Sequence, residues 1–166
     1  MFPTRAYARD AEAIVALRDD LARWQVASGL VQWQPGEVTP DQVREQIADQ
    51  QWWLLRDDGA ISATVRVLEA DPRIWDDLVA PEDADALYVH GLMVRRTHRG
   101  RGLGTVMLDW VAERVRDAGR TILRLDCAAA NPSLRAYYAG LGFTERGVRE
   151  FDPPWRPLVR LEKSVG

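Results

Sequence analysis

A glycine-rich turn at residues 98–105, HRGRGLGT, constrains the fold of this chain more than any other stretch. It follows the β-prone run ALYVHGLMV at residues 86–94 and precedes residues 105–119, whose apolar side chains recur at helical spacing. A strand, a glycine turn and a helix in this order place unpaired backbone N–H groups at a helix start. Because glycine lets an anion approach the backbone closely, the turn is suited to hold phosphate.

The other segments predict helices and strands that alternate along the chain. Helices are expected from Asp10 to the region of Gly29, over residues 39–47 behind a Thr39 cap, and over residues 131–143; strands are expected at about residues 4–8, 52–56, 61–68, 121–127, 143–151 and 157–164. With 166 residues and 46% hydrophobic content, the chain is long enough to bury one core. We therefore expect an α/β protein with a mixed sheet, in a single domain over residues 1–166.

Composition excludes several classes of partner. The net charge of -3 argues against binding nucleic acid by overall charge, and the basic stretch at residues 95–101 lacks a reading helix or interleaved aromatic residues. Cys127 is the only cysteine, so no internal disulfide is expected, and we interpret it as a buried inert thiol. The chain does not begin like a signal peptide and holds no apolar run of about 18 residues. We expect a soluble, cytoplasmic protein with no nucleic-acid or membrane partner and no metal site.

Three phosphate-binding patterns compete for the glycine turn. The Walker loop fails because no lysine follows the glycines. The dinucleotide pattern G-x-G-x-x-G has Thr105 where its third glycine belongs, although Asp126 ends the next predicted strand at about the right distance, so it stays as the weaker alternative. Residues 99–104 match R/Q-x-x-G-x-G/A directly after a strand. This motif resembles the pyrophosphate loop of the GNAT superfamily of acetyl-CoA-dependent N-acetyltransferases.

A second motif strengthens the resemblance. Residues 131–143, NPSLRAYYAGLGF, are similar to the family signature Asn-x-x-Ala-x-x-x-Tyr-x-x-x-Gly-Phe, in the right order after the first motif. Leu134 and Gly140 depart from the usual residues, and both departures concern helix packing. The resemblance implies a GNAT-like mixed central sheet with helices on both faces, acetyl-CoA as co-substrate, and transfer of its acetyl group to an amine.

The resemblance also implies which residues contact acetyl-CoA. The pantetheine arm would contact the backbone of three strand residues, Leu92, Met93 and Val94. The pyrophosphate would be held by the turn, which consists of Arg99, Gly100, Arg101, Gly102, Leu103 and Gly104, and Thr105 would add a hydroxyl at the helix start. Asn131 would cap the last helix and hydrogen-bond the pantetheine. The strand side chains themselves are expected to be ordinary core.

Two residues are candidates for the chemistry. A protonated amine cannot attack a thioester, so a base is needed, and His90 lies on the strand before the turn, where the arylalkylamine branch of the family carries a histidine. A histidine that only hydrogen-bonds in the core is the alternative. The motif places Tyr138 at the family's tyrosine that meets the cofactor sulfur and can protonate the departing thiolate. Packing in the core is its alternative, with Tyr137 as the fallback, and His98 is expected at the surface.

The acceptor is the least determined part. Residues 69–85 hold seven carboxylates against one arginine, which indicates either a solvated acidic loop or an electrostatic attraction for a cationic substrate, with Trp75 as an aromatic wall. Trp33 and Trp155 also fall in connecting segments that could line the acceptor site. We expect a small cationic primary amine, with aminoglycoside-type antibiotics as one candidate. A protein or peptide acceptor, a non-catalytic acyl-CoA sensor and a homodimer stay open.

Overall fold

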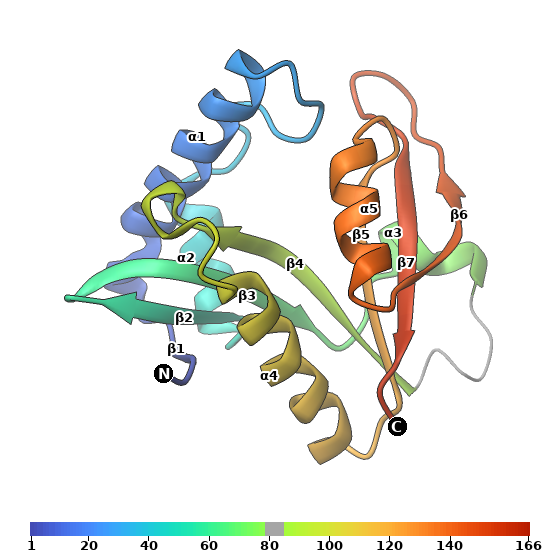
Figure 1. Cartoon of the computed structure of the whole chain (residues 1–166). Helices are drawn as coiled ribbons and strands as arrows, with labels where there is room; N and C mark the ends of the chain where they lie inside the picture. The colour runs from blue at the N-terminus through green and yellow to red at the C-terminus, as the bar shows by residue number, and fades with distance from the viewer. Residues whose placement is uncertain (79–84) are drawn as a thin grey trace. The chain divides into compact units, whose positions relative to one another are not determined.

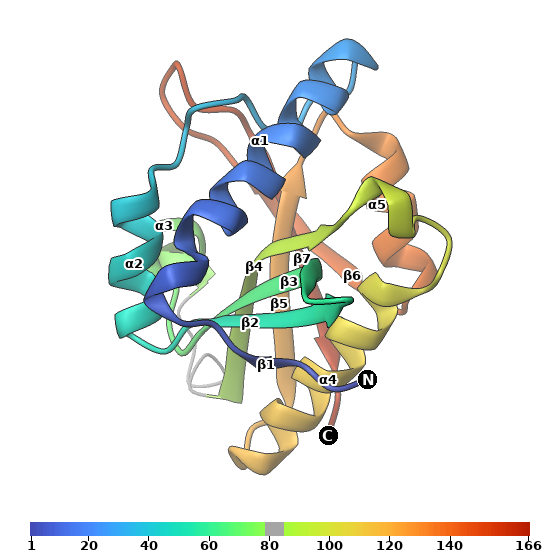
Figure 2. The ribbon, with the colours of Figure 1, turned by 90° about the vertical axis from the view of Figure 1, so that its left-hand side faces the viewer.

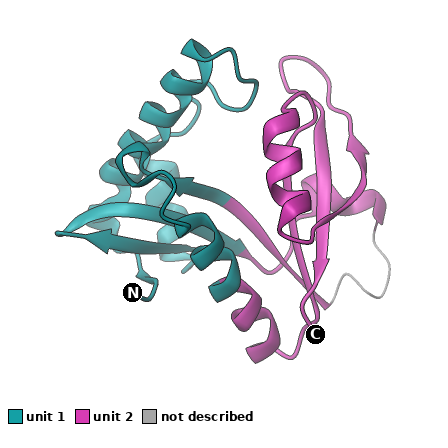
Figure 3. Cartoon of the chain, in the orientation of Figure 1, with its two compact units in different colours: residues 1–67, 91–110 teal, residues 68–90, 111–166 magenta. Residues whose placement is uncertain are grey.

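The computed structural model of the chain describes residues 1–78 and 85–166 (Figure 1). These residues form two compact units (Figure 3): unit 1 is residues 1–67 and 91–110, and unit 2 is residues 68–90 and 111–166. Within the described ranges, no helix combines the length and the apolar character that crossing a bilayer requires.

The elements follow the predicted order closely. The helices are α1 (Ala11–Ala27), α2 (Pro40–Ala48), α3 (Pro72–Trp75), α4 (Leu103–Asp117) and α5 (Pro132–Gly140), with short 3-10 turns at Ala8–Asp10, Asp76–Leu78 and Arg96–His98. The strands are β1 (Thr4–Arg5), β2 (Trp52–Asp57), β3 (Ala60–Leu68), β4 (Ala86–Val94), β5 (Ile122–Ala128), β6 (Thr144–Arg149) and β7 (Leu158–Ser164). They form a seven-stranded sheet in the order β1-β2-β3-β4-β5-β7-β6. Because β4 pairs with β5 in parallel while β5 and β7 are antiparallel, the predicted mixed sheet is confirmed.

Unit 1 has helices on both faces of its strands. α1 and α2 lie beside each other (Figures 1 and 2) and bury an apolar cluster that includes Ile14, Leu54 and Met93. Side chains alternate along a strand, so Trp53 points away from this cluster. Its ring centroid lies 4.7 Å from that of Trp110 on α4, which therefore covers the other face.

Local sequence signals explain where the elements of unit 1 begin and turn. The Thr39 side chain accepts a hydrogen bond from the Gln42 N–H at the start of α2, and Pro40 occupies the first helical position, as predicted. Asp58 and Gly59 have φ values of 48° and 78° in the hairpin between β2 and β3. Two successive positive φ angles suit the twist of a tight hairpin, so the Asp-Gly turn is confirmed.

Unit 2 corrects the prediction for residues 69–85. Part of this acidic segment folds into α3 and the turn Asp76–Leu78, and residues 79–84 lie outside the described residues. Trp75 is only 2% exposed and packs edge-on against Tyr88, with 6.0 Å between ring centroids. The prediction that Trp75 forms an aromatic wall for a substrate is therefore wrong. Proline at the helix start and two large apolar side chains, Ile74 and Trp75, make this segment part of the core instead.

Gly91 occupies a constrained position within β4 that the sequence analysis missed. Its φ is +56°, and its carbonyl accepts a hydrogen bond of 2.7 Å from the Thr64 hydroxyl. A Cβ at this position would lie 2.5 Å from the ring of the buried Trp52. Only glycine fits here, because both the backbone conformation and the aromatic neighbour exclude a side chain.

We expect Gly91→Ala to destabilise the protein more than Gly29→Ala. Gly29 has a φ of +71°, and no atom lies within 4 Å of the position that a Cβ would take there, so its substitution costs only the backbone strain, about 1–2 kcal/mol. Gly91→Ala adds the clash with Trp52, an overpacking cost of about 1–3 kcal/mol. Urea unfolding of the two variants measures the difference, and equal losses of unfolding free energy would contradict this account of Gly91.

Candidate active site

The glycine turn lies in unit 1 between β4 and α4. Gly100 and Gly102 have φ values of 80° and 73°, which favour glycine over any other residue. A Cβ at either position would have no atom within 4 Å. Nothing in the described part of the chain fills the space beside these two glycines, so a ligand can approach the backbone there.

Two backbone N–H groups of the turn are already used within it. The Arg99 N–H donates to the Arg96 carbonyl at 3.1 Å, and the Arg101 N–H donates to the His98 carbonyl at 3.4 Å. Of the predicted pyrophosphate-binding span, these two residues therefore offer their exposed side chains more readily than their N–H groups.

The start of α4 supplies the remaining donors. The N–H of Val106 donates to the Gly102 carbonyl at 3.0 Å, as the helical ladder requires. The N–H groups of Leu103, Gly104 and Thr105 come before it in the first turn, where helix geometry provides no acceptor. Together with the positive end of the helix dipole, these groups make the start of α4 suited to bind an anion.

Asp57, at the end of β2, anchors the basic side chains of the turn. Its carboxylate lies 2.9 Å from Nε2 of His98 and 3.6 Å from the guanidinium of Arg101. His98, expected at the surface, is largely buried by this contact, with 14% of its side chain exposed. Arg96 stacks on Trp24, 3.7 Å from the ring centroid. Asp57 carried no signal in the sequence, because it lies more than 40 positions from the turn.

The strand before the turn keeps the expected side-chain roles in part. Met93 is 1% exposed and belongs to the core of unit 1, as predicted, whereas Leu92 and Val94 are partly exposed. The N–H of Arg95 donates to the Ser62 carbonyl at 2.9 Å. The contact of these three strand residues with pantetheine stays a prediction.

Unit 2 holds the second motif on α5. The side-chain oxygen of Asn131 accepts a hydrogen bond of 3.1 Å from the Leu134 N–H, so the predicted cap is confirmed. Asn131 is 5% exposed. Its predicted bond to the cofactor is a second role beside the cap, and it stays a prediction.

Tyr138 is buried on α5, and Tyr137 is not. Tyr138 is 6% exposed and packs its ring 5.7 Å from that of Phe143, while Tyr137 is 41% exposed. Burial above all raises the pKa of the Tyr138 phenol, so this side chain keeps its proton near neutral pH. Burial likewise raises the pKa of Cys127 to about 12, which supports the interpretation of an inert thiol.

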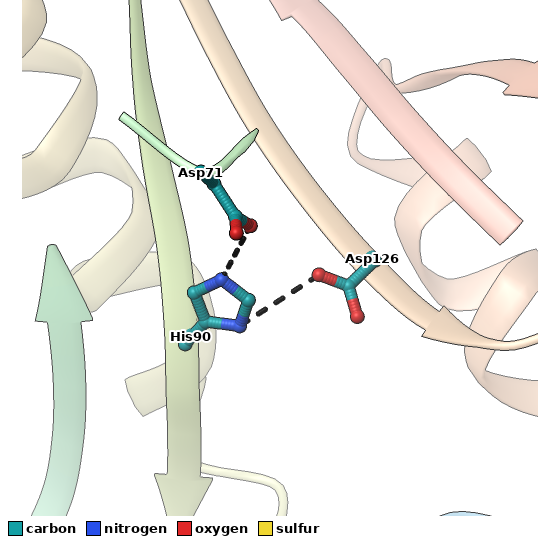
Figure 4. A group of neighbouring side chains, drawn as sticks. All are labelled: Asp71, His90 and Asp126. Atoms are coloured by element: carbon teal, nitrogen blue, oxygen red, sulfur yellow. Dashed lines mark hydrogen bonds and ion pairs between the residues drawn. The ribbon is translucent and has the colours of Figure 1, made fainter. Parts of the chain in front are cut away.

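Two carboxylates flank the imidazole of His90 in unit 2 (Figure 4). Nε2 of His90 lies 2.7 Å from Oδ2 of Asp71, and Nδ1 lies 3.7 Å from Oδ1 of Asp126. The parallel register that pairs Val89 with Leu125 places His90 and Asp126 next to each other on β4 and β5. Asp71 reaches the same histidine from the residue before α3.

The charges of Asp71 and His90 both act on the pKa of Asp126. Burial raises the pKa of Asp126 to about 6, and the negative charge of Asp71 adds to this increase, while His90 opposes it. The Oδ1 atom of Asp126 is buried and has no hydrogen-bond partner among residues 1–78 and 85–166. A carboxyl group that titrates near neutral pH beside an imidazole is suited to hold and release protons.

The three side chains also have the spacing of a cation-binding group, with one carboxylate at each ring nitrogen. The three ligand-type atoms lie within 4.8 Å of one another, a spacing that a cation can span. However, Asp71 contacts one ring nitrogen of His90 and Asp126 faces the other. The two carboxylates thus lie against different ring nitrogens, an arrangement that suits proton transfer.

Comparison with known proteins assigns the family. The model of the Acetyltransferase (GNAT) family matches residues 18–143, a range that includes both motifs. The chain belongs to the GNAT acetyltransferase family. It is 30% identical over 144 residues to the uncharacterized N-acetyltransferase YesJ of Bacillus subtilis (strain 168), covering 84% of this chain and 79% of YesJ.

Solved structures agree with this assignment at the level of the fold. A GNAT-family acetyltransferase from Listeria monocytogenes 4b F2365 superposes with a TM-score of 0.78 at 24% identity, covering 98% of this chain and 94% of that one. A Salmonella typhimurium protein solved with its cofactor acetyl-CoA superposes with a TM-score of 0.70 at 15% identity, covering 100% and 94%. The activity follows from the family match and the relative YesJ: this GNAT protein is an acetyl-CoA-dependent N-acetyltransferase, as the two motifs predict.

We expect the stability of this acetyltransferase to respond to pH through Asp126. In the folded protein the pKa of Asp126 is raised from 3.8 to about 6, so folding favours the protonated carboxyl. The stability that depends on this protonated form is complete below pH 4 and is lost as the pH rises through about 6. An asparagine cannot ionise, so Asp126→Asn does not lose stability in this way. From pH 4.5 to pH 8, the unfolding free energy of the variant should rise by about 1–3 kcal/mol relative to that of the parent. Urea unfolding at both pH values measures the gain.

Glu145→Gln is the control of opposite sign. The hydrogen bond from Arg135 lowers the pKa of Glu145, so its ionised form stabilises the fold and the variant loses stability relative to the parent as the pH rises. A constant difference between Asp126→Asn and the parent across this range would contradict the assigned burial of Asp126.

Proposed function

We propose that this GNAT enzyme acetylates a small cationic primary amine, with His90 as the base and Tyr138 as the acid. The observation that carries the proposal is the partly buried group formed by His90, Asp71 and Asp126. Two carboxylates around one imidazole attract a cation and provide a place for its proton.

The reaction removes two protons from the acceptor nitrogen, one before and one after the attack, and supplies one proton to the sulfur. The ammonium group of the acceptor gives a proton to His90, and the resulting amine attacks the thioester carbon of acetyl-CoA. The carbon–sulfur bond breaks, and its electron pair leaves on the thiolate of coenzyme A. Tyr138 donates its phenolic proton to that sulfur, and the second proton lost by the new amide nitrogen restores the phenol.

Acetyl-CoA is proposed to bind through its pyrophosphate to the glycine turn. The open space beside Gly100 and Gly102 and the donors at the start of α4 support this placement. The exposed side chains of Arg99 and Arg101 add positive charge there. The pantetheine arm is proposed to contact the backbone of residues 92–94 and the side chain of Asn131.

Contacts in unit 2 support one acidic group over the others as the attraction for the acceptor. Asp76 lies 3.0 Å from Arg149, and Asp77 accepts a hydrogen bond from Arg160, so both charges are compensated locally. Asp71 instead faces His90. The attraction for a cation is therefore proposed to come from the group around His90 and not from the whole acidic segment.

The tryptophans in connecting segments add little to the acceptor site. Trp33 has the guanidinium of Arg18 4.8 Å from its ring centroid and packs against the core of unit 1. Trp155 is 58% exposed, with Arg73 4.5 Å from its ring. We therefore propose no requirement for a ring in the acceptor, and aminoglycoside-type antibiotics stay one candidate among small amines.

We expect Gly102→Val to weaken acetyl-CoA binding at least tenfold, because a branched side chain would fill the space beside the turn and strain its backbone. Titration calorimetry with acetyl-CoA measures the change. Gly119→Val is the matched control, since Gly119 has a similar φ of +70° and an equally open Cβ position in the turn that ends α4. Equal losses of affinity in both variants would show that general strain, and not the turn, is responsible.

The proposed acceptor class is tested by the release of free thiol from acetyl-CoA with a panel of amines. The panel contains simple primary amines, a polyamine, an amino acid, an aminoglycoside and a lysine peptide, each at low and high salt. We expect higher kcat/KM for small cationic amines than for the peptide, and a decrease at high salt because ions screen the attraction.

Tyr138→Phe shows whether the thiol release is catalysed by this enzyme and not by a contaminant. The variant should lower kcat much more than the affinity for acetyl-CoA. A preference for the peptide over every small amine, without salt dependence, would overturn the proposed acceptor.

A further inference from the structure

We infer that His90 takes the proton of the acceptor on Nδ1, because Asp71 fixes its other nitrogen as Nε2–H and the buried carboxylate of Asp126 shares the arriving proton. Asp71 and Asp126 are thus positioning residues that act through His90. The inference rests on the proposed role of His90 as the base.

The first step is the contact with Asp71. A neutral imidazole carries one N–H, and an ionised carboxylate can only accept a hydrogen bond. The separation of 2.7 Å between Nε2 and Oδ2 is that of a charge-assisted bond, and the side chain of Asp71 is 10% exposed. The proton of neutral His90 therefore lies on Nε2, and a second proton can bind only to Nδ1.

The second step is the position of Asp126. Nδ1 faces Oδ1 of Asp126 across 3.7 Å, with the side chain of Asp126 11% exposed. This gap is longer than a direct hydrogen bond, so the interaction in the resting state is electrostatic. An imidazolium at this position is stabilised by the ionised carboxylate, and a protonated Asp126 is the alternative location for the same proton.

Other charged groups on this side of unit 2 have partners of their own, including Arg160, the cross-strand neighbour of Asp126 on β7, which donates a hydrogen bond to Asp77. Tyr88, two positions before His90 on β4, has a pKa raised by burial and then by Asp71, so it stays neutral. Arg124 on β5 donates to its hydroxyl at 3.2 Å and forms an ion pair of 2.8 Å with Glu162 on β7. Arg120 donates to the Ala86 carbonyl at 2.7 Å. Removing one carboxylate at position 71 or 126 therefore changes the charge around His90 directly.

The two steps make different substitutions distinguishable. Asp71→Asn keeps a side-chain oxygen that accepts from Nε2–H but removes the charge, whereas Asp71→Ala removes both. Asp126→Asn removes the charge on the opposite side and leaves the bond to Asp71 in place. Only Asp71→Ala should change the tautomer, and all three should make His90 harder to protonate.

Nuclear magnetic resonance of the ¹⁵N-histidine-labelled protein tests both steps without any acceptor. The chain has only two histidines, so a His98→Gln sample assigns the His90 signals. We expect neutral His90 to be the Nε2–H tautomer in the parent, in Asp71→Asn and in Asp126→Asn, and a mixture of tautomers in Asp71→Ala. The midpoint of the His90 titration should fall by about one pH unit or more in each variant.

An Nδ1–H tautomer in the parent, or an unchanged midpoint in Asp126→Asn, would overturn the inference. Asp76→Asn is the matched control, because Asp76 pairs with Arg149, and it should leave the His90 tautomer unchanged.

The pH dependence of kcat/KM on its acidic limb, the side where activity falls, then separates this inference from the proposed function. We expect the limb to shift in Asp71→Asn and Asp126→Asn by the same amount as the midpoint seen by resonance. A limb that stays in place while the midpoint shifts would show that His90 is not the base, which overturns the proton step of the reaction and the inference together. Failure of the amine panel alone would change the acceptor and leave the tautomer result intact.

Discussion

The parallel pairing of β4 with β5 is the interaction on which the chemistry of unit 2 depends. Its register, Ala86 to Val89 against Ile122 to Leu125, brings His90 beside Asp126 although they lie 36 positions apart in the sequence. A shift of one residue would turn one of the two side chains to the opposite face of the sheet, because side chains alternate along a strand. The buried strand residues around them hold this register, since slipping would expose apolar surface to water.

Burial of polar groups is the main cost of this arrangement, and neighbouring contacts offset it. Arg124 is almost fully buried, yet its guanidinium bonds Glu162 and Tyr88 and lies 4.5 Å from the ring centroid of Trp75. Such contacts compensate the loss of hydration that an isolated buried charge would suffer. Asp126 is less well compensated, which is why its pKa is raised to about 6. An incompletely solvated carboxyl group is destabilising when ionised, but it is useful where a proton has to be shared.

The glycine turn shows how far local pattern extends. The strand before the glycines, the turn that they form and the helix after it were all predicted from neighbouring residues, because φ preference and helix spacing are local properties. Asp57, which holds His98 and Arg101, was not predicted, since it comes from the preceding hairpin. Trp75 was predicted wrongly for a related reason. The acidic residues of this segment suggested that it is exposed, but its apolar side chains pack in a buried cluster with Tyr88.

The sequence by itself determined the order of the elements apart from α3, the caps at Thr39 and Asn131, the two motifs and hence the family and its acetyl donor. These features depend on residues within a few positions of one another, where hydrogen bonds and periodicity act directly. The tertiary structure alone decided that Asp71 and Asp126 meet at His90. Contacts between segments 19 and 36 positions apart follow from sheet register and core packing, and these depend on the whole chain burying its apolar surface at once.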